Sequence, residues 1–408
     1  MTAELNRIVI VGSGHAGVEA ASALRQDGYT GAITLVGDEP HLPYQRPPLS
    51  KEFLKGPDDA GLPLKGEAFF PAHDIALRLG VRVSRIDRES HHVVLSDGAE
   101  LGYDHLVLAL GARNRVPPVP GLEPGKALQL RSLADARSLI QRLDGLDRAA
   151  IIGGGFIGLE MAALLRARGV TIDLIEAAPM LMGRVLSQPM SAFFREFHEA
   201  LGTRLHLETL VRHVEHGPRS SALRLSNGAE LEVDAVLVAA GVEANVEIAA
   251  EAGLAADNGI LVDSLLATED PAISAIGDCA AYPNSWTGSI TRLESVQNAV
   301  DQARTLAARL TGTRRPYAAL PWFWSHQGSA RLQIAGMANG HNECVLRGDP
   351  ASQKFSIFLY AGERLVAVES VNSAAEHMAA RRLLSAGISV PKQLAADPDA
   401  SLKPLIPV

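Results

Sequence analysis

Cysteine and aromatic residues are scarce in this chain of 408 residues. Its two cysteines, Cys279 and Cys344, are too few for a disulfide framework or a cysteine-rich metal site, and too far apart for a CxxC redox pair. The adjacent His91 and His92 would point to opposite sides of a regular strand, so they cannot share one metal ion. Aromatic residues make up 5% of the chain, which argues against a stacking surface for nucleic acid. We therefore expect no metal site and no nucleic-acid partner.

Long apolar runs and an excess of positive charge are also missing. No uninterrupted apolar stretch reaches the ~18 residues of a transmembrane helix. The N-terminal MTAELNRIVIVGSG has no apolar core ahead of small cleavage residues, so no signal peptide is expected. Acidic residues outnumber basic ones by 46 to 38, and the net charge of -8 has the wrong sign for DNA or an anionic membrane. These features predict a cytoplasmic protein without a membrane partner.

What the sequence does contain is short apolar runs that end directly in glycines. Residues 7–11 (RIVIV) are typical of a buried parallel strand, GSGHAG follows, a helix is expected up to Gly28, and 32–36 (AITLV) is a second strand. The same order recurs from residue 148: a strand at 148–152 (RAAII), then GGGFIG, a helix to about Gly169, and a strand at 172–175. Each copy predicts a βαβ unit.

A second similarity supports duplication of the whole unit. Residues 96–111 (SDGAELGYDHLVLALG) match 226–241 (SNGAELEVDAVLVAAG) at eight of sixteen positions, and each segment predicts a hairpin with a D-G or N-G turn followed by a buried strand. Later segments differ: a strand at 273–276, a helix over 293–310, and strands with a final helix at 373–386 after Pro321. We expect two homologous dinucleotide-binding units and a C-terminal α+β domain.

The glycine-rich loops carry the expected chemistry. Both fit G-x-G-x-x-G, in which the glycines permit a tight turn, close approach to a pyrophosphate and helix packing, and the phosphate lies at the helix N-terminus. Asp38 and Glu176 follow the second strand of each unit, where each could accept hydrogen bonds from a ribose hydroxyl. Glu176 is followed by Ala177, Ala178 and Pro179, without Arg or Lys for a 2′-phosphate, which favours NAD over NADP. Two dinucleotides on one chain imply electron transfer between them.

Six motifs make the chain similar to a known family. They are LPYQRPPLSK (42–51), LVLALGARNR (106–115), GGGFIGLE (153–160), AIGDCA (275–280), RLESVQNAVDQA (292–303) and PWFWSHQG (321–328). Over nearly its whole length the chain resembles the FAD-containing, NADH-dependent ferredoxin reductases of bacterial oxygenase systems. The resemblance implies the α/β glutathione-reductase-like fold, with two Rossmann-type dinucleotide-binding domains and the C-terminal α+β domain. It implies an FAD domain at 1–115 and 242–320, an NAD domain at 116–241 and the C-terminal domain at 321–408.

The resemblance also implies which residues bind FAD. Gly12, Gly14, Ala16 and Gly17 would hold the pyrophosphate, with Asp38 on the ribose. Asp278 resembles the carboxylate that binds the ribitol, although an Asp after Gly277 also fits an ordinary turn. A helix starting near Glu294, Ser295 and Val296 would direct its N-terminus at the flavin and favour its anionic reduced form. The remaining positions carried over are Arg46, Lys51, Val83, Ala109, Gly111, Arg131, Gly277 and Trp324.

The NAD site and the catalytic residues are implied in the same way. The positions carried over for NAD are Gly153, Gly155, Ile157, Gly158, Glu160, Glu176 and Gly241. Lys51 is expected beside the flavin ring, where a cation can stabilise the reduced flavin. Glu160 is expected to position the nicotinamide and to pair with Lys51, although acids are common in a first helical turn for dipole reasons alone. Trp324 is expected near the flavin on the side where electrons leave, and relatives usually have Asp where this chain has His326.

The implied reaction is hydride transfer from NADH to FAD, followed by single-electron transfer to a [2Fe-2S] ferredoxin that serves a cytochrome P450 or a Rieske oxygenase. An acidic carrier needs a basic patch, and two stretches are candidates, each of which could equally be an ordinary solvated face. The first contains Arg304, Arg309, Arg314 and Arg315, and the second Arg381, Arg382 and Lys392.

Three other functions stay open from the sequence: a rubredoxin reductase, an NADH oxidase of the same fold, and a redox-sensing flavoprotein of the apoptosis-inducing-factor type. A disulfide reductase is disfavoured, because Cys279 lies in the ribitol motif and has no partner cysteine.

Overall fold

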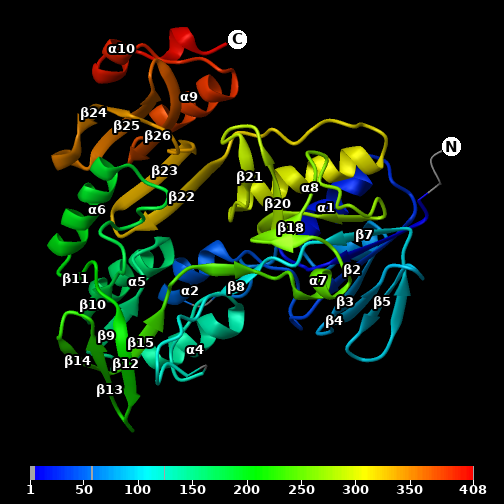
Figure 1. Cartoon of the computed structure of the whole chain (residues 1–408), viewed down its shortest axis with the longest axis horizontal. Helices are drawn as coiled ribbons and strands as arrows, with labels where there is room; N and C mark the ends of the chain where they lie inside the picture. Colours follow the sequence, from blue (N-terminus) through cyan, green and yellow to red (C-terminus); the bar gives the residue numbers. More distant parts are fainter. Residues whose placement is uncertain (1–4, 57, 124, 408) are drawn as a thin grey trace. The chain divides into compact units, whose positions relative to one another are not determined.

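The computed structural model describes residues 5–56, 58–123 and 125–407 (Figure 1). The first four residues of the segment in which we expect no signal peptide lie outside the described residues. The chain forms two compact units, each described by itself below. The first unit comprises Met1–Gln45, Asp58–Arg113 and Glu243–Ala319, and the second comprises Arg46–Pro57, Asn114–Val242 and Leu320–Val408.

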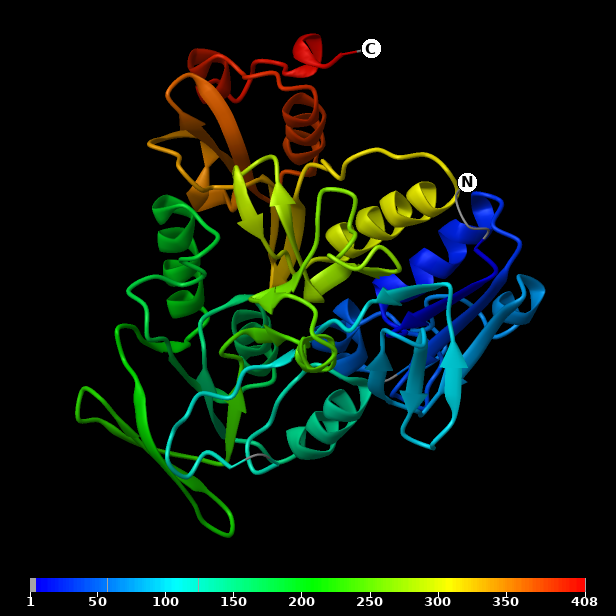
Figure 2. The ribbon, with the colours of Figure 1, turned by 45° about the vertical axis from the view of Figure 1, so that its right-hand side comes forward.

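A parallel sheet forms the centre of the first unit. Its strand order is β19-β7-β1-β2-β3, and every neighbouring pair is parallel. The strands are β1 (Arg7–Val11), β2 (Ala32–Gly37), β3 (Ile75–Leu79), β7 (His105–Leu108) and β19 (Ile273–Ala275). All four residues of β7 are buried, as expected for a strand covered on both faces. Helices α1 (His15–Gln26) and α8 (Val296–Leu310) lie side by side (Figure 2).

Smaller elements complete the first unit. An antiparallel sheet contains β4 (Val83–Asp87), β5 (His92–Leu95) and β6 (Glu100–Gly102). A four-stranded sheet contains β17 (Ala256–Asp257), β18 (Gly259–Leu261), β20 (Ala280–Asn284) and β21 (Ser289–Thr291). The short helices are α3 (Phe69–Ala72), α7 (Glu247–Glu251) and the 3-10 turn η2 (Gly277–Cys279). The chain passes from one unit to the other within β8 (Ala112–Asn114) and β16 (Val242–Ala244).

The second unit contains a sheet of the same kind, with the parallel order β11-β10-β9-β15. Its strands are β9 (Arg148–Ile152), β10 (Thr171–Ile175), β11 (Arg204–His206) and β15 (Ala235–Val238). Its helices are η1 (Pro47–Ser50), α2 (Glu52–Lys55), α4 (Leu133–Leu143), α5 (Phe156–Ala167) and α6 (Gln188–Ala200). An antiparallel sheet contains β12 (Val211–His216), β13 (Ser221–Leu225) and β14 (Glu230–Val233).

The duplication predicted from the sequence extends to individual hydrogen bonds. In the first unit, Asp104 Oδ2 accepts from the backbone N–H groups of Asn6 and Arg7, at 2.9 and 2.8 Å. In the second, Asp234 Oδ2 accepts from the corresponding N–H groups of Asp147 and Arg148, at 3.0 and 2.8 Å. Both carboxylates therefore satisfy backbone donors just before the first strand of their unit, and the predicted βαβ repeats are confirmed.

The C-terminal part of the second unit is an antiparallel sheet of order β22-β23-β26-β25-β24 with helices beside it, so the predicted α+β composition is confirmed. The strands are β22 (Trp322–Gln327), β23 (Ala330–Gly336), β24 (Glu343–Asp349), β25 (Lys354–Ala361) and β26 (Arg364–Val371). The helices are η3 (Pro350–Ser352), α9 (Ala374–Ser385), α10 (Lys392–Ala396) and η4 (Lys403–Leu405). Helix α9 packs on β23 and β26.

Aromatic contacts join this sheet to helices α5 and α6 of the same unit. Phe323 of β22 packs on Phe156 of α5 with ring centroids 4.4 Å apart, and Phe355 of β25 packs edge-on against Phe193 of α6 at 4.8 Å. A polar contact lies at the same interface: the backbone N–H and the hydroxyl of Ser187, the N-cap of α6, both donate to the carboxylate of Glu369 on β26.

The segment Arg46–Pro57 belongs by its contacts to the second unit, whereas the boundaries drawn from the sequence place it in the FAD domain. The side chains of Ser50 and Lys51 bond to Glu160, and the guanidinium of Arg168 donates to the carbonyl of Leu54. The residues in these contacts are more than a hundred positions apart in the sequence, so local sequence patterns do not reveal that they are neighbours. The three-domain division itself stays a prediction.

Glu369 gives the second unit a pH-dependent stability. Burial raises the pKa of Glu369 from 4.5 to about 7, so between these values the native protein holds a proton that the unfolded chain has released. The contribution of this group to the free energy of unfolding therefore falls as the pH rises from 4.5 to 7. Relative to Glu369→Gln, the wild-type protein should lose up to about 3 kcal/mol across this window in urea unfolding. Parallel stability curves for the two proteins would contradict the assignment.

Candidate functional sites in the two units

The glycine-rich loop of the first unit lies between β1 and α1. A Cβ on Gly12, whose φ is +111°, would lie 2.1 Å from the carbonyl oxygen of Ala109, and a Cβ on Gly17 would lie 1.9 Å from the carbonyl oxygen of Gly12. A Cβ on Gly14 would meet no described atom within 4 Å. Gly14 is the N-cap of α1, and Ala16 lies buried in its first turn. The loop is thus closed by backbone contacts on one side and open at the helix N-terminus, as an anion site requires.

The second unit repeats this arrangement between β9 and α5. Gly153 has a φ of +115° and a Cβ there would lie 2.3 Å from the carbonyl oxygen of Ala239, while a Cβ on Gly158 would lie 2.1 Å from that of Gly153. A Cβ on Gly155, the N-cap of α5, would meet no described atom within 4 Å. The two loops fit the pyrophosphates of two dinucleotides.

The two predicted ribose acids differ in how firmly they are held. Glu176 follows β10, and its two carboxylate oxygens accept from the backbone N–H groups of Gly154 and Ala178, at 2.6 and 2.8 Å. Asp38 directly follows β2 and is exposed. The carboxylate of Glu176 is therefore fixed against its phosphate loop as a negative charge at the carboxyl end of its sheet.

Other predicted FAD residues of the first unit lie after β7, in η2 and at the start of α8, and one, Val83, begins β4. Asp278 lies in η2, and its carbonyl accepts from Arg292, which pairs with Glu294 at 2.8 Å. Ser295 is the N-cap of α8, where its hydroxyl accepts from the Asn298 N–H at 3.0 Å. The rest are Val83 and Ala109, which are buried, Gly111 and Gly277, which have positive φ, and Val296, which begins α8.

Four of the predicted FAD residues belong to the second unit: Arg46, Lys51, Arg131 and Trp324. Within that unit the guanidinium of Arg46 donates to the carbonyl of Arg131 at 2.7 Å. The ring of Trp324 lies 5.4 Å from that of Trp322. Among the predicted NAD residues, Ile157 is 40% exposed and Gly241 has a φ of +92°.

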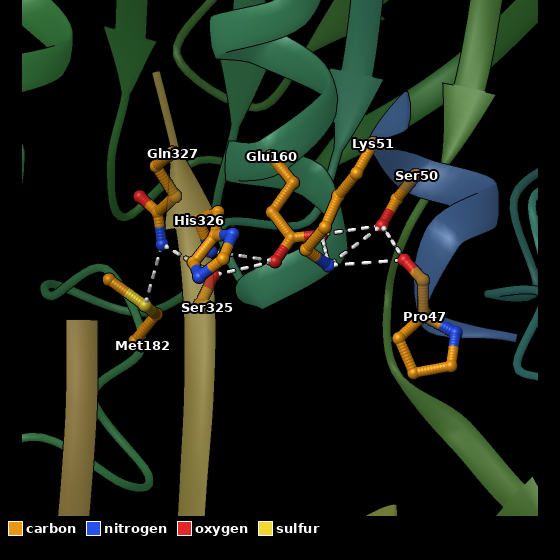
Figure 3. A network of polar contacts seen from close by, with 8 residues as sticks. All are labelled: Pro47, Ser50, Lys51, Glu160, Met182, Ser325, His326 and Gln327. Carbon is orange, nitrogen blue, oxygen red and sulfur yellow. Dashed lines mark hydrogen bonds and ion pairs between the residues drawn. The ribbon is translucent and has the colours of Figure 1, made fainter. Parts of the chain in front are cut away.

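The carboxylate of Glu160 lies at the centre of a polar cluster in the second unit (Figure 3). Its Oε2 accepts from Lys51 Nζ at 2.8 Å and from the hydroxyl of Ser50 at 2.5 Å. Its Oε1 accepts from the hydroxyl of Ser325 at 2.8 Å and from the backbone N–H of His326 at 3.2 Å. The Glu160 side chain is only 3% exposed, so four donors compensate the burial of its charge. The ion pair with Lys51 that the resemblance implied is present.

Lys51 is fixed from three directions. Besides Glu160, its ammonium group donates to the carbonyl of Pro47 and to the hydroxyl of Ser50, both at 3.3 Å. A lysine ammonium has three N–H bonds, so all three are used. The cluster therefore holds one cation at a defined place within the second unit.

Sequence reasoning missed Ser50, Ser325 and Gln327 as part of this cluster. Ser325 and Gln327 lie two apart on β22 and both are fully buried, so they point to the same face of the sheet. Two polar residues at alternate positions of a strand, Ser325 and Gln327, are the signal in the sequence that points to one shared face. His326 takes part through its backbone N–H. Its side chain reaches solvent but is partly covered, and this partial desolvation, together with the nearby Lys51, lowers the pKa of its imidazole.

The cysteines offer no redox centre. Cys279 is fully buried, its thiol donates to the carbonyl of Ile276, and burial raises its pKa to about 11. Cys344 lies exposed on β24 as a free thiol. Within residues 5–56, 58–123 and 125–407, no group of three or more His, Cys, Asp and Glu side chains could hold a metal ion. A search of the same residues finds no helix with the length and apolar character needed to cross a membrane.

Two family models match the chain. The pyridine nucleotide-disulphide oxidoreductase model matches residues 6–303, and the reductase C-terminal model matches residues 322–406. Rhodocoxin reductase of Rhodococcus erythropolis is 48% identical over 97% of this chain and 93% of its own length.

Solved structures agree with these matches. The ferredoxin reductase for the CYP199A2 system of Rhodopseudomonas palustris has a TM-score of 0.96 at 45% identity, covering 98% of this chain and all of that one. The reductase in a covalent putidaredoxin reductase–putidaredoxin complex has a TM-score of 0.93 at 37% identity, covering 98% of each chain. The chain therefore belongs to the pyridine nucleotide-disulphide oxidoreductase family, and within it to the FAD-dependent NADH:ferredoxin reductases.

Proposed function

We propose that this protein passes electrons from NADH through FAD to a [2Fe-2S] ferredoxin of an oxygenase system, of the cytochrome P450 or the Rieske type. The observation that carries the proposal is the pair of homologous pyrophosphate loops, one in each unit, together with the Lys51–Glu160 cluster. Its relatives include the putidaredoxin reductase that was solved as a covalent complex with putidaredoxin. The two free thiols suit the reducing conditions of the cytoplasm, which we propose as its location.

In this proposal the glycine-rich loop of the first unit binds the pyrophosphate of FAD and that of the second unit binds the pyrophosphate of NADH. Bound FAD supplies the capacity to accept a hydride and to release electrons singly. Gly12, Gly14 and Gly17 form a loop that fits its pyrophosphate, and Asp38 is exposed directly after β2. The chain's own contribution is to bind and orient, because hydride transfer itself requires no acid or base from the protein.

The Lys51–Glu160 pair is proposed to set the electrostatics of the reaction. Lys51 supplies a cation that can stabilise negative charge on the reduced flavin, and Glu160 keeps that cation in place. The Glu160 carboxylate can accept about four hydrogen bonds, and it already accepts four. A nicotinamide carboxamide that donates to Glu160 must therefore displace one of the present donors. The pair thus links substrate binding to the position of the cation.

Glu160→Gln and Glu160→Ala should both slow the reduction of bound FAD by NADH, by about 10- to 100-fold in anaerobic stopped flow. The reason is that Lys51 loses its ionic partner and its fixed position. Glu199→Gln, which removes an exposed carboxylate of α6, is the control and should leave the rate unchanged. An unaltered rate in both Glu160 variants would sink the proposed role.

The fixed carboxylate of Glu176 is proposed to select NADH over NADPH. Both its oxygens are held by backbone donors, so it cannot turn away from a 2′-phosphate group. Two negative charges held close together in a partly buried site repel each other by several kcal/mol. Ala177 and Ala178 provide no cation to offset this repulsion.

Glu176→Gln should therefore raise kcat/KM for NADPH relative to NADH by about tenfold, because the amide removes the charge while its oxygen still accepts from one of the two backbone donors. The matched control is Glu208→Gln, which removes a charge two residues beyond the next strand. Steady-state rates with both nucleotides measure the ratio; equal ratios in wild type and Glu176→Gln would contradict the selection mechanism.

The two candidate basic stretches differ in how much unpaired positive charge they expose. In the first, Arg304 pairs with Glu19 at 2.7 Å and Arg309 turns inward to Ser274, so the prediction of Arg309 as part of a basic surface is wrong. Burial lowers the pKa of Arg309, in agreement with its inward position. Arg314 and Arg315 remain exposed.

In the second stretch, Lys392 is paired with Glu343 and Glu363, at 2.8 and 2.9 Å. Arg381 stacks on the ring of Trp322 at 4.1 Å, and Arg382 is exposed. Arg381 thus presents positive charge beside the Trp322–Trp324 pair, and Arg382 follows it on α9; we propose this surface as the docking site for an acidic ferredoxin.

Ferredoxin reduction should slow as ionic strength rises, because docking rests on opposite charges. Arg381→Gln combined with Arg382→Gln should lower the rate by roughly three- to tenfold at low salt and flatten the salt dependence. Arg195→Gln combined with Arg224→Gln, which removes two exposed cations on α6 and β13, is the charge-matched control. A wild-type rate that does not respond to salt, or an equal loss in the control, would count against this docking surface.

A further inference from the structure

A buried chain of polar side chains continues from Glu160 into the second unit, beyond the residues so far assigned a role. The amide nitrogen of Gln327 donates to the hydroxyl of Ser325 at 3.3 Å, and its amide oxygen lies 2.9 Å from Nε2 of His198 on α6. The side chains of Ser325, Gln327 and His198 are all fully buried. Most polar atoms in such a place have a hydrogen-bond partner, because a buried polar atom without one is costly.

The direction of every hydrogen bond in this chain follows from its chemistry. Burial lowers the pKa of His198, so its imidazole is neutral at pH 7 and carries one N–H. Nδ1 finds no hydrogen-bond partner within the described residues, so the proton on Nε2 donates to the Gln327 oxygen. The hydroxyl of Ser325 gives its proton to Glu160, so it can only accept from Gln327. The donors therefore run in one direction, from His198 to the carboxylate.

The second amide hydrogen of Gln327 has its own acceptor. It points to the sulfur of Met182 at 3.6 Å (Figure 3), and the backbone N–H of Met182 donates to the carbonyl of Gly154 in the glycine-rich loop. Turning the amide round would set its oxygen against Met182 and Ser325, neither of which has a proton to give it. The orientation of Gln327 is thus fixed by its neighbours.

We propose that Gln327 is a positioning residue that, through the hydroxyl of Ser325, holds the Glu160 carboxylate in the orientation that pairs with Lys51. Its effect on NADH oxidation rests on the function proposed above, whereas its effect on the Lys51 segment does not. The Gln327 amide donates to the hydroxyl oxygen of Ser325 and so restricts the rotation of that hydroxyl. Without the amide, the Ser325 hydroxyl is less restricted, and the hydrogen bond that it donates to Glu160 is less well oriented.

The direct test is hydrogen–deuterium exchange of the peptide 47–56 in the FAD-loaded full-length protein. The amides of Lys51 and Gly56 are hydrogen-bonded within this segment, and its side chains are anchored on Glu160. Gln327→Met and Ser325→Ala should each speed exchange of this peptide several-fold. Ser325→Thr keeps the hydroxyl and should exchange as the wild type does, so that faster exchange in Ser325→Ala reports the lost hydroxyl and not the substitution itself.

The matched control is Glu369→Gln, which alters the other polar contact between α6 and the C-terminal sheet without touching the donor chain. Its exchange over 47–56 should be unchanged. An equal acceleration in Glu369→Gln, or wild-type exchange in Gln327→Met or in Ser325→Ala, would overturn the proposal.

A kinetic readout separates positioning from a general loss of structure. Gln327→Met should lower the limiting rate of FAD reduction by roughly three- to tenfold, the loss expected for one hydrogen bond, while the dissociation constant of NADH changes by less than about twofold. The double variant with Ser325→Ala should be no slower than Ser325→Ala alone, because both act on one donor. Multiplying effects would overturn the proposal. Faster exchange with an unchanged limiting rate would support the positioning and overturn the proposed role of Glu160.

Discussion

A steric constraint at two glycines shapes both units. Gly12 and Gly153 have φ near +110°, and a Cβ at either position would overlap a carbonyl oxygen of the neighbouring strand. No other residue type fits, so the chain turns within one residue from a buried strand into a helix whose N-terminus stays open. The open helix N-termini, and with them the proposed pyrophosphate sites, follow from that turn. Because it occurs twice, the protein can bind two dinucleotides and transfer electrons between them.

The two copies have diverged where chemistry is needed. Glu19 and Glu160 occupy equivalent positions, two residues after the last glycine of each loop. Glu19 forms a surface ion pair with Arg304, whereas Glu160 is buried under four donors and fixes Lys51. An exposed pair contributes little, while a buried carboxylate must be fully hydrogen-bonded to persist. A glutamate at the same place in the two units thus forms an ion pair with Arg304 in the first and holds Lys51 for the proposed reaction in the second.

Local features were predictable from the sequence, and contacts between distant segments were not. The strands at 7–11 and 148–152 have the predicted bounds, because strand, glycine turn and helix are each encoded in adjacent residues. Ser325 meets Glu160 across 165 positions, and nothing in its own neighbourhood indicates that partner. Arg309 was expected on a surface but bonds inward, since the spacing of a helix does not say what its neighbours cover. The resemblance supplied the Lys51–Glu160 pair, which residue patterns alone left open.

The central claim is that the two units pass electrons from NADH to a one-electron carrier. Anaerobic titration of the purified holoprotein, followed by its visible absorbance, tests this most directly. The account predicts a yellow protein that one equivalent of NADH bleaches, and whose colour two equivalents of oxidised [2Fe-2S] ferredoxin restore, because each ferredoxin takes one electron. A colourless protein, or a flavin that NADH bleaches but ferredoxin does not reoxidise, would contradict it.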